Sequence, residues 1–168
     1  MNTGEGAAIR LRPPRNRPDP RAVHWWRAQW LLPTAAPVVV LAVLGALLAP
    51  ARLWLLPPAA VLAVLGAACA ALFPRWWFRV HRWEITDEAV YVRTGILRQV
   101  WRIAPMSRIQ TVDTVRGPLE QLFRLATVTV TTASAKGAVR ISGLDHERAA
   151  ELAEQLTRVT GATPGDAT

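Results

Sequence analysis

The sequence predicts a membrane protein in which a two-helix transmembrane hairpin precedes a small, mostly-β barrel or sandwich that ends in one C-terminal α-helix. Three observations support this fold class. Two long apolar runs are separated by only three residues. After the second run, the composition changes to short segments rich in Val, Ile and Thr, which is typical of strands. The last segment then places apolar residues at helical spacing.

The two apolar runs cover residues 31–49 and 53–73, contain no charged side chain, and are joined by Pro50, Ala51 and Arg52. As helices rising about 1.5 Å per residue they reach roughly 28 and 31 Å, which matches a hydrocarbon core about 30 Å thick. A signal peptide is the competing interpretation of the first run, because residues 49–51 have the small-x-small pattern of a cleavage site. The immediate second run and the length of the first favour two spans within residues 30–74.

Small residues recur every fourth position in both runs, which predicts close antiparallel packing of the helices. They are Gly45 and Ala49 in the first run and Ala59, Ala63, Ala67 and Ala71 in the second. General alanine richness is the alternative explanation. Neither run contains a charge that would mark an ion or proton pathway.

The net charge of +8 lies entirely in the part of the chain that ends at Arg82, with ten Arg against Glu5 and Asp19. The remainder is neutral, which argues against a nucleic-acid-binding domain. Six Arg precede the first run and three closely follow the second, whereas the connection has only Arg52. This bias predicts a multi-pass membrane protein with both termini in the cytoplasm.

Aromatic and basic side chains cluster at the ends of the runs, where they are expected to anchor the hairpin at the membrane interface. These predicted anchors are Trp25, Trp26, Arg27, Trp30, Trp54, Arg75, Trp76, Trp77, Arg79 and Arg82. Residues 1–29, rich in Arg and Pro, are expected to form a disordered basic cytoplasmic tail, and residues 161–168 a second disordered tail.

Six strands are predicted in the C-terminal domain, at 80–86, 89–94, 96–103, 108–115, 125–132 and 138–142. The short connections between them favour antiparallel pairing. A closing helix is predicted after Asp145 as N-cap, with Leu152 and Leu156 on its apolar face and Gly161 as its stop.

The segment IAPMSRIQTVDTVRGPLEQLFRLATVTVTTAS, residues 103–134, resembles the bacterial membrane-anchored pleckstrin-homology-like family, the YdbS-like group. Its most specific part is the spacing of Pro105, Arg108, Gln110, Gly117 and Pro118, and the resemblance extends over residues 25–160. It implies a location in the bacterial inner (plasma) membrane, a pleckstrin-homology-like (PH-like) domain at 80–160 and a complex with related membrane proteins. Arg124 stands where the family often has Gly, and apolar residues from Ile109 to Val130, including Leu119, Leu122 and Phe123, are core candidates.

A polar strand face is the candidate interaction surface. Arg98 and Arg102 share one side of the third predicted strand by period two, and Arg93 lies on its hairpin partner. The candidate residues are Arg93, Arg98, Trp101, Arg102, Arg108 and Gln110. Solvation, or pairing with nearby carboxylates, is the alternative role for the arginines. The first hairpin loop contains Asp87 and Glu88, whose charges disfavour a phosphoinositide site there.

The three histidines are scattered and no nucleophile elbow or phosphate loop occurs, so the sequence indicates no enzyme, no metal site and no cofactor. The expected function is a membrane-tethered protein-interaction or assembly module whose partners are the lipid bilayer and another membrane protein or a second copy of the chain. Two alternatives stay open: a module that senses anionic lipid, and an accessory subunit of a transport or secretion complex.

Overall fold

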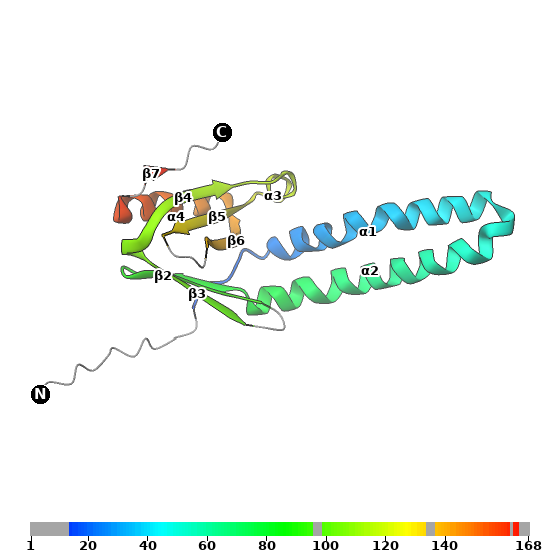
Figure 1. The fold of residues 1–168 in the computed structure, drawn as a ribbon, viewed down its shortest axis with the longest axis horizontal. Coiled ribbons are helices and arrows are strands. Elements are labelled where there is room, and N and C mark those ends of the chain that lie inside the picture. The colour runs from blue at the N-terminus through cyan, green and yellow to red at the C-terminus, as the bar shows by residue number, and fades with distance from the viewer. Residues whose placement is uncertain (1–13, 96–98, 134–136, 162, 165–168) are drawn as a thin grey trace, which may run out of the picture.

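The computed structural model describes residues 14–95, 99–133, 137–161 and 163–164. A long antiparallel helical hairpin projects from one end of a small β domain (Figure 1). Helix α1 spans Ala22–Leu47, a 3-10 turn η1 spans Ala49–Ala51, and helix α2 spans Arg52–Val80. Both helices extend past the apolar runs at their domain ends, so about two turns of helix connect each span to the domain.

The hairpin helices are apolar on all sides. Only 6% of the most apolar window of α1 and 17% of that of the η1–α2 segment is buried within the chain. Such surfaces are typical of helices that face lipid, because a helix that is hydrophobic on all sides is found either in the core of a large protein or in a membrane. Five prolines lie inside the two helices, which membrane helices tolerate better than soluble ones do.

Glycine, more than the predicted alanine stripe, allows the two helices to approach each other. A Cβ on Gly66 would lie 2.9 Å from Thr34 Oγ1, and a Cβ on Gly45 would lie 2.8 Å from Leu56 Cδ2. The four-residue alanine stripe is wrong in detail. Ala59 is buried, but the remaining predicted positions Ala49, Ala63, Ala67 and Ala71 are exposed. The reason is that the buried face of α2 runs through Gly66 and Ala70 instead.

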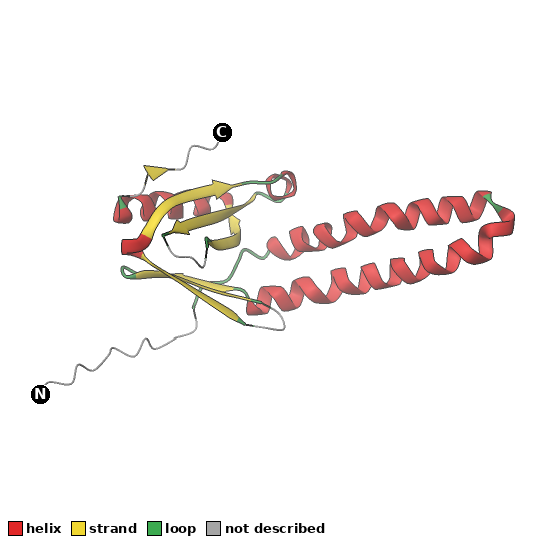
Figure 2. Ribbon diagram, in the orientation of Figure 1, coloured by secondary structure: helices red, strands yellow, loops and turns green. Residues whose placement is uncertain are grey.

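The domain contains two sheets that face each other across a common core (Figure 2). The first has the antiparallel order β1-β2-β3, with β1 at Arg82–Ile85, β2 at Ala89–Thr94 and β3 at Val100–Pro105. The second has the order β6-β5-β4-β7, with β4 at Ile109–Val115, β5 at Leu125–Thr132, β6 at Val139–Asp145 and β7 at Thr163–Pro164. A 3-10 turn η2 (Met106–Arg108) joins the sheets, and a short helix α3 (Pro118–Leu122) joins β4 to β5.

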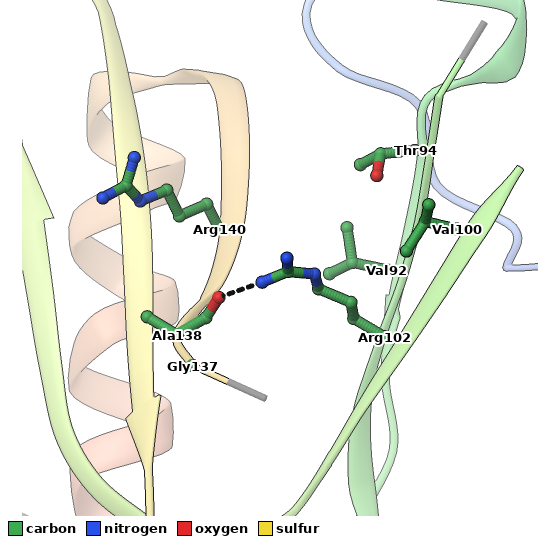
Figure 3. Close-up of a pocket in the computed structure, with 7 residues that line it drawn as sticks. All are labelled: Val92, Thr94, Val100, Arg102, Gly137, Ala138 and Arg140. Carbon is green, nitrogen blue, oxygen red and sulfur yellow. Dashed lines mark hydrogen bonds between the residues drawn. The ribbon is translucent and has the colours of Figure 1, made fainter. Parts of the chain in front are cut away.

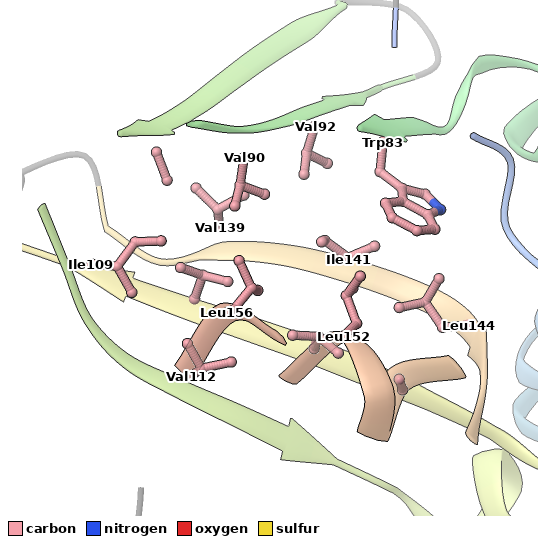
Figure 4. Packing of buried hydrophobic residues seen from close by; sticks show 14 of the residues in the cluster. Trp83, Val90, Val92, Ile109, Val112, Val139, Ile141, Leu144, Leu152 and Leu156 are labelled. Atoms are coloured by element: carbon pink, nitrogen blue, oxygen red, sulfur yellow. The ribbon is translucent and has the colours of Figure 1, made fainter. Parts of the chain in front are cut away.

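The core lies between the two sheets and is closed by helix α4, His146–Thr160 (Figure 4). Val90 and Val92 of the first sheet, Ile141 of the second and Leu156 of α4 are at most 1% exposed. The apolar residues alternate along β5, which is expected for a strand with one buried face.

The predicted fold class is confirmed, and so are the two ends of the closing helix. The Asp145 carboxylate accepts a hydrogen bond from the Glu147 N–H at 3.0 Å, and Gly161 has φ 61°. The strand limits differ: β6 continues to Asp145 rather than ending at 142, and β3 begins at Val100. Residues 96–98 of the predicted third strand lie outside the described residues.

The disordered tail predicted at residues 1–29 differs from the structure over residues 14–29, and residues 1–13 lie outside the described residues. Helix α1 begins at Ala22, and residues 14–21 pack along the domain as a segment that we call the N-terminal strap. Asn16 forms an antiparallel bridge with Trp83 through N–H···O contacts of 3.0 and 3.1 Å, and the Asp19 N–H donates to the Gly143 carbonyl at 2.8 Å. Proline blocks helix formation in this segment, but an extended chain with free N–H groups between prolines can still pair with a sheet edge.

Candidate interaction site

A cleft of about 470 Å³ opens between the β2–β3 hairpin and the start of β6 (Figure 3). The residues that line it are Val92, Thr94, Val100, Arg102, Gly137, Ala138 and Arg140. None of these lining residues is acidic, and two are arginines. The cleft therefore combines apolar walls with positive charge, which suits an anionic group carried on an apolar or extended chain.

Arg102 is the predicted residue that the structure places in this cleft. Its Nη1 donates a 2.6 Å hydrogen bond to the Ala138 carbonyl, so the side chain crosses from β3 to the beginning of β6 (Figure 3). A guanidinium carries five N–H donors, so this contact leaves others available. Arg140, on β6, also lines the cleft, and its guanidinium points away from Arg102 in Figure 3. Sequence reasoning missed Arg140, because nothing local indicates that β6 lies beside β3.

Arg93 and Arg102 do not share a face, and this part of the prediction is wrong. The hairpin register pairs Arg93 with Trp101 and Val92 with Arg102. Directly paired residues point to the same side of an antiparallel sheet, so Arg93 and Trp101 lie on the outer side while Arg102 lies on the inner side. Arg93 stacks over the Trp101 ring at 5.8 Å, and its Nε donates to the Val80 carbonyl at 3.3 Å.

The other candidate surface residues are scattered. Arg108 is exposed in η2, and Gln110 is exposed at the register shift between Ile109 and Thr111. Arg98 lies outside the described residues. The structure therefore groups Arg93 with Trp101, and Arg102 with the unpredicted Arg140, in place of a single arginine surface.

Tryptophans join the hairpin to the domain. Trp25 and Trp26 are 8% and 4% exposed, and they cluster with Ala22 of α1 and Leu125 of β5. Trp26 stacks on Trp77 of α2 with centroids 5.7 Å apart and an interplanar angle of 13°. These indoles were expected to face lipid headgroups, but burial leaves little of Trp25 or Trp26 to do so. They bind both hairpin helices to the domain.

Gly143 of β6 allows α1 to begin directly against the domain. It has φ 74°, a conformation that favours glycine, and a Cβ there would lie 2.8 Å from the Ala22 Cβ. Any side chain at this position would separate the first turn of α1 from β6.

The N-terminal strap is also held by an ion-pair cluster at the start of α4. The Arg21 guanidinium donates to Asp19 at 3.0 Å and to Asp145. Burial alone would raise the pKa of Asp145, but the hydrogen bonds from Arg21 and from the Glu147 N–H hold that pKa below its usual value. The cluster lines a smaller cleft of about 220 Å³ between the strap and α4.

His81 is the single residue between α2 and β1, and it is 5% exposed. Neither ring nitrogen has a hydrogen-bond partner among the described residues, and the ring lies 6.2 Å from that of Trp26. Burial lowers the pKa of His81 to about 4. The imidazole is therefore neutral near pH 7 and packs as part of the junction.

The remaining predicted anchors keep more exposed positions on the hairpin. Trp30 stacks on Phe73 with centroids 5.5 Å apart, Trp54 is 83% exposed at the far end, and Trp76 is 47% exposed. Arg75 and Arg79 are exposed, whereas Arg27 and Arg82 are partly buried.

The described residues contain no cluster of three or more His, Cys, Asp or Glu side chains that could hold a metal ion. The larger cleft combines arginine with apolar side chains, whereas the smaller one also contains the carboxylates of Asp19 and Asp145.

Comparison with known proteins agrees with this architecture. The family model for the bacterial PH domain matches residues 32–160. The UPF0699 transmembrane protein YdbS of Bacillus subtilis (strain 168) is 29% identical over 170 residues, covering 91% of this chain and 97% of that protein. No solved structure matches the chain.

Proposed function

The chain is a membrane protein of the bacterial PH domain family, and from this we propose that its β domain is a protein-interaction module that the hairpin holds in a fixed orientation at the cytoplasmic membrane surface. The observation that carries the proposal is the junction. Only His81 separates α2 from β1, and the Trp26–Trp77 stack joins both helices to the domain.

A fixed orientation suits a module that must meet other membrane proteins. Tethering to the same bilayer raises effective concentration, and a rigid connection removes much of the orientational entropy that association would otherwise cost. A flexible linker would give the first benefit without the second.

The cleft lined by Arg102 and Arg140, which we call the arginine cleft, is the surface that we assign to the partner. Arg102 supplies positive charge inside it, and Arg140 is an exposed side chain at its wall that can change rotamer to meet a ligand. The proposed occupant is an acidic, extended segment of another membrane protein or of a second copy of this chain. Apolar contacts with Val92 and Val100 would add affinity to the charge pairing.

We place both termini in the cytoplasm. Nine arginines flank the domain side of the hairpin, and the far side has only Arg52. The Arg52 guanidinium lies 3.4 Å from the Gly45 carbonyl and 3.3 Å from that of Ala46, so it caps the end of α1. A reporter fused after Thr168 that is active only in the cytoplasm tests the orientation, and activity of a periplasmic reporter there would invert it.

Site-specific photocrosslinking in living cells tests the cleft. A photoreactive amino acid in place of Thr94, at the cleft wall, is expected to give discrete crosslinked products that R102E and R140E together abolish. The same probe in place of Glu154, exposed on α4, is the matched control. Products that persist after both charge reversals, or that arise equally from position 154, would refute the assignment of the cleft.

A further inference from the structure

The connection between β4 and β5 exposes apolar side chains outside the hairpin. We call residues 115–124, which include helix α3, the α3 turn. Leu122 is 73% exposed and Val115 is 54% exposed, although Leu122 was expected in the core. Exposed leucine is common on proteins and needs no explanation by itself. This turn differs from an ordinary exposed leucine in two respects, its position beside the hairpin and the charge of its surface.

The α3 turn is fastened to the base of the hairpin. Its residues Leu119 and Phe123 pack against the buried cluster that contains Trp25 and Trp26 of α1. Figure 1 shows α3 projecting from the domain in the same direction as the hairpin, beside the first turns of α1. The exposed Leu122 therefore has a defined height relative to the two spans.

The length of α1 places this height near the membrane surface. Its 26 residues give about 39 Å of helix, which exceeds a hydrocarbon core of about 30 Å by about 9 Å. This excess is roughly six residues and corresponds to the first turns of α1, which include Trp25 and Trp26. A headgroup layer is about 5–8 Å thick, so the elements packed on these tryptophans lie at headgroup level.

The charges of the α3 turn suit a lipid surface. Arg116 precedes Leu122 in the sequence and Arg124 follows it, and both arginines are exposed. Glu120, the carboxylate of the turn, is 6% exposed and accepts 2.7 Å hydrogen bonds from the Gly117 N–H and the Thr127 hydroxyl. The turn therefore presents apolar and cationic groups outward and keeps its acidic group inside, a combination that favours anionic interfaces.

From these observations we propose that the α3 turn is a third membrane contact, in which Leu122 and Val115 enter the interfacial layer and Arg116 and Arg124 bind lipid phosphates. The contact would limit the tilt of the domain and its hairpin relative to the bilayer. It does not depend on the arginine cleft, which lies between β3 and β6, or on any protein partner.

Spin-label accessibility in the full-length protein tests this contact. The protein carries Cys69→Ala, is placed in nanodiscs that contain anionic lipid and a single copy of the chain, and has one nitroxide. Labels at Leu122→Cys or Val115→Cys are expected to collide more with oxygen, and less with a water-soluble nickel chelate, than a control label at Glu151→Cys on exposed α4. Ratios equal to that of the control would overturn the proposal.

A second variant tests whether Leu122 itself provides the contact. With the label kept at position 115, Leu122→Asn is expected to raise the accessibility to nickel several-fold, because the turn then leaves the lipid. Leu122 is mostly exposed, so folding should be unaffected, and unchanged circular dichroism checks this. Labels shielded from both reagents only when discs hold several copies would show that protein covers the patch, which would also overturn the lipid assignment.

Discussion

Trp26→Ala should release the domain from the hairpin without unfolding it. Trp26 is 4% exposed, and it stacks on Trp77 in a cluster distinct from the main core, which contains Val90, Ile141 and Leu156. Truncating a buried tryptophan to alanine costs about 3–5 kcal/mol, of which the ring stack accounts for about 0.5–1.5 kcal/mol. The loss falls on the junction, because the main core keeps its own contacts.

Distances between two spin labels would measure this release. With Cys69→Ala as background, labels at Ala49 on the hairpin end and Glu154 on α4 should give a narrow distance distribution in the parent protein and a broad one in Trp26→Ala. Trp76→Ala is the matched control, since Trp76 is 47% exposed and outside the cluster. Hydrogen exchange along β5 should stay slow in both variants. A distribution as narrow in Trp26→Ala as in Trp76→Ala would refute the rigid junction.

Three further predictions concern stability and can be measured by thermal unfolding with tryptophan fluorescence. The pKa of His81 is lowered to about 4 in the folded protein, against about 6.5 in the unfolded chain. The unfolded state therefore binds more protons between these pH values, so the stability should fall as the pH drops from 6.5 towards 4. His81→Leu should lose this dependence, and a variant with the same pH profile as the parent would contradict the prediction. Arg124 has φ 54°, so Arg124→Gly should stabilise by up to about 1 kcal/mol, because the left-handed penalty of about 1–2 kcal/mol exceeds the entropic cost of glycine; destabilisation would count against it. Gly66→Leu should destabilise the protein by about 1–3 kcal/mol, because the new side chain overpacks against Thr34. Ala67 is exposed at the neighbouring position, so Ala67→Leu should change the stability little. Equal effects of the two substitutions would show that Gly66 does not face α1.

Features encoded by local residues could be predicted from the sequence. The ends of α4 follow from a carboxylate that caps the first turn and a glycine that accepts a positive φ, and both appear at Asp145 and Gly161. The resemblance marked Arg124 as a position where the family pattern often has Gly, and its backbone is left-handed with φ 54°. Each of these features depends on a few adjacent residues.

Features set by register or by helix rotation could not be predicted in the same way. The predicted hairpin placed Arg93 and Arg102 on neighbouring strands, but its register determined that they point to opposite sides. Four-residue spacing identified small residues on α2, but whether Ala67 or Gly66 faces α1 depends on the rotation of the helix about its axis. The N-terminal strap is paired with the domain through backbone N–H and C=O groups, so its side chains need show no periodic pattern that the sequence could reveal.

The junction and the arginine cleft share a strand, which gives the domain a physical route between them. Arg93 of β2 donates to the carbonyl of Val80, one of the last carbonyls of α2, which no residue of the helix itself can satisfy. On the same strand, Val92 and Thr94 line the cleft. A ligand that widened the cleft by moving β2 would therefore pull on the end of α2, and a change in the tilt of α2 would move one wall of the cleft. Because the Trp26–Trp77 stack resists both movements, weakening that stack should loosen the cleft as well as the domain.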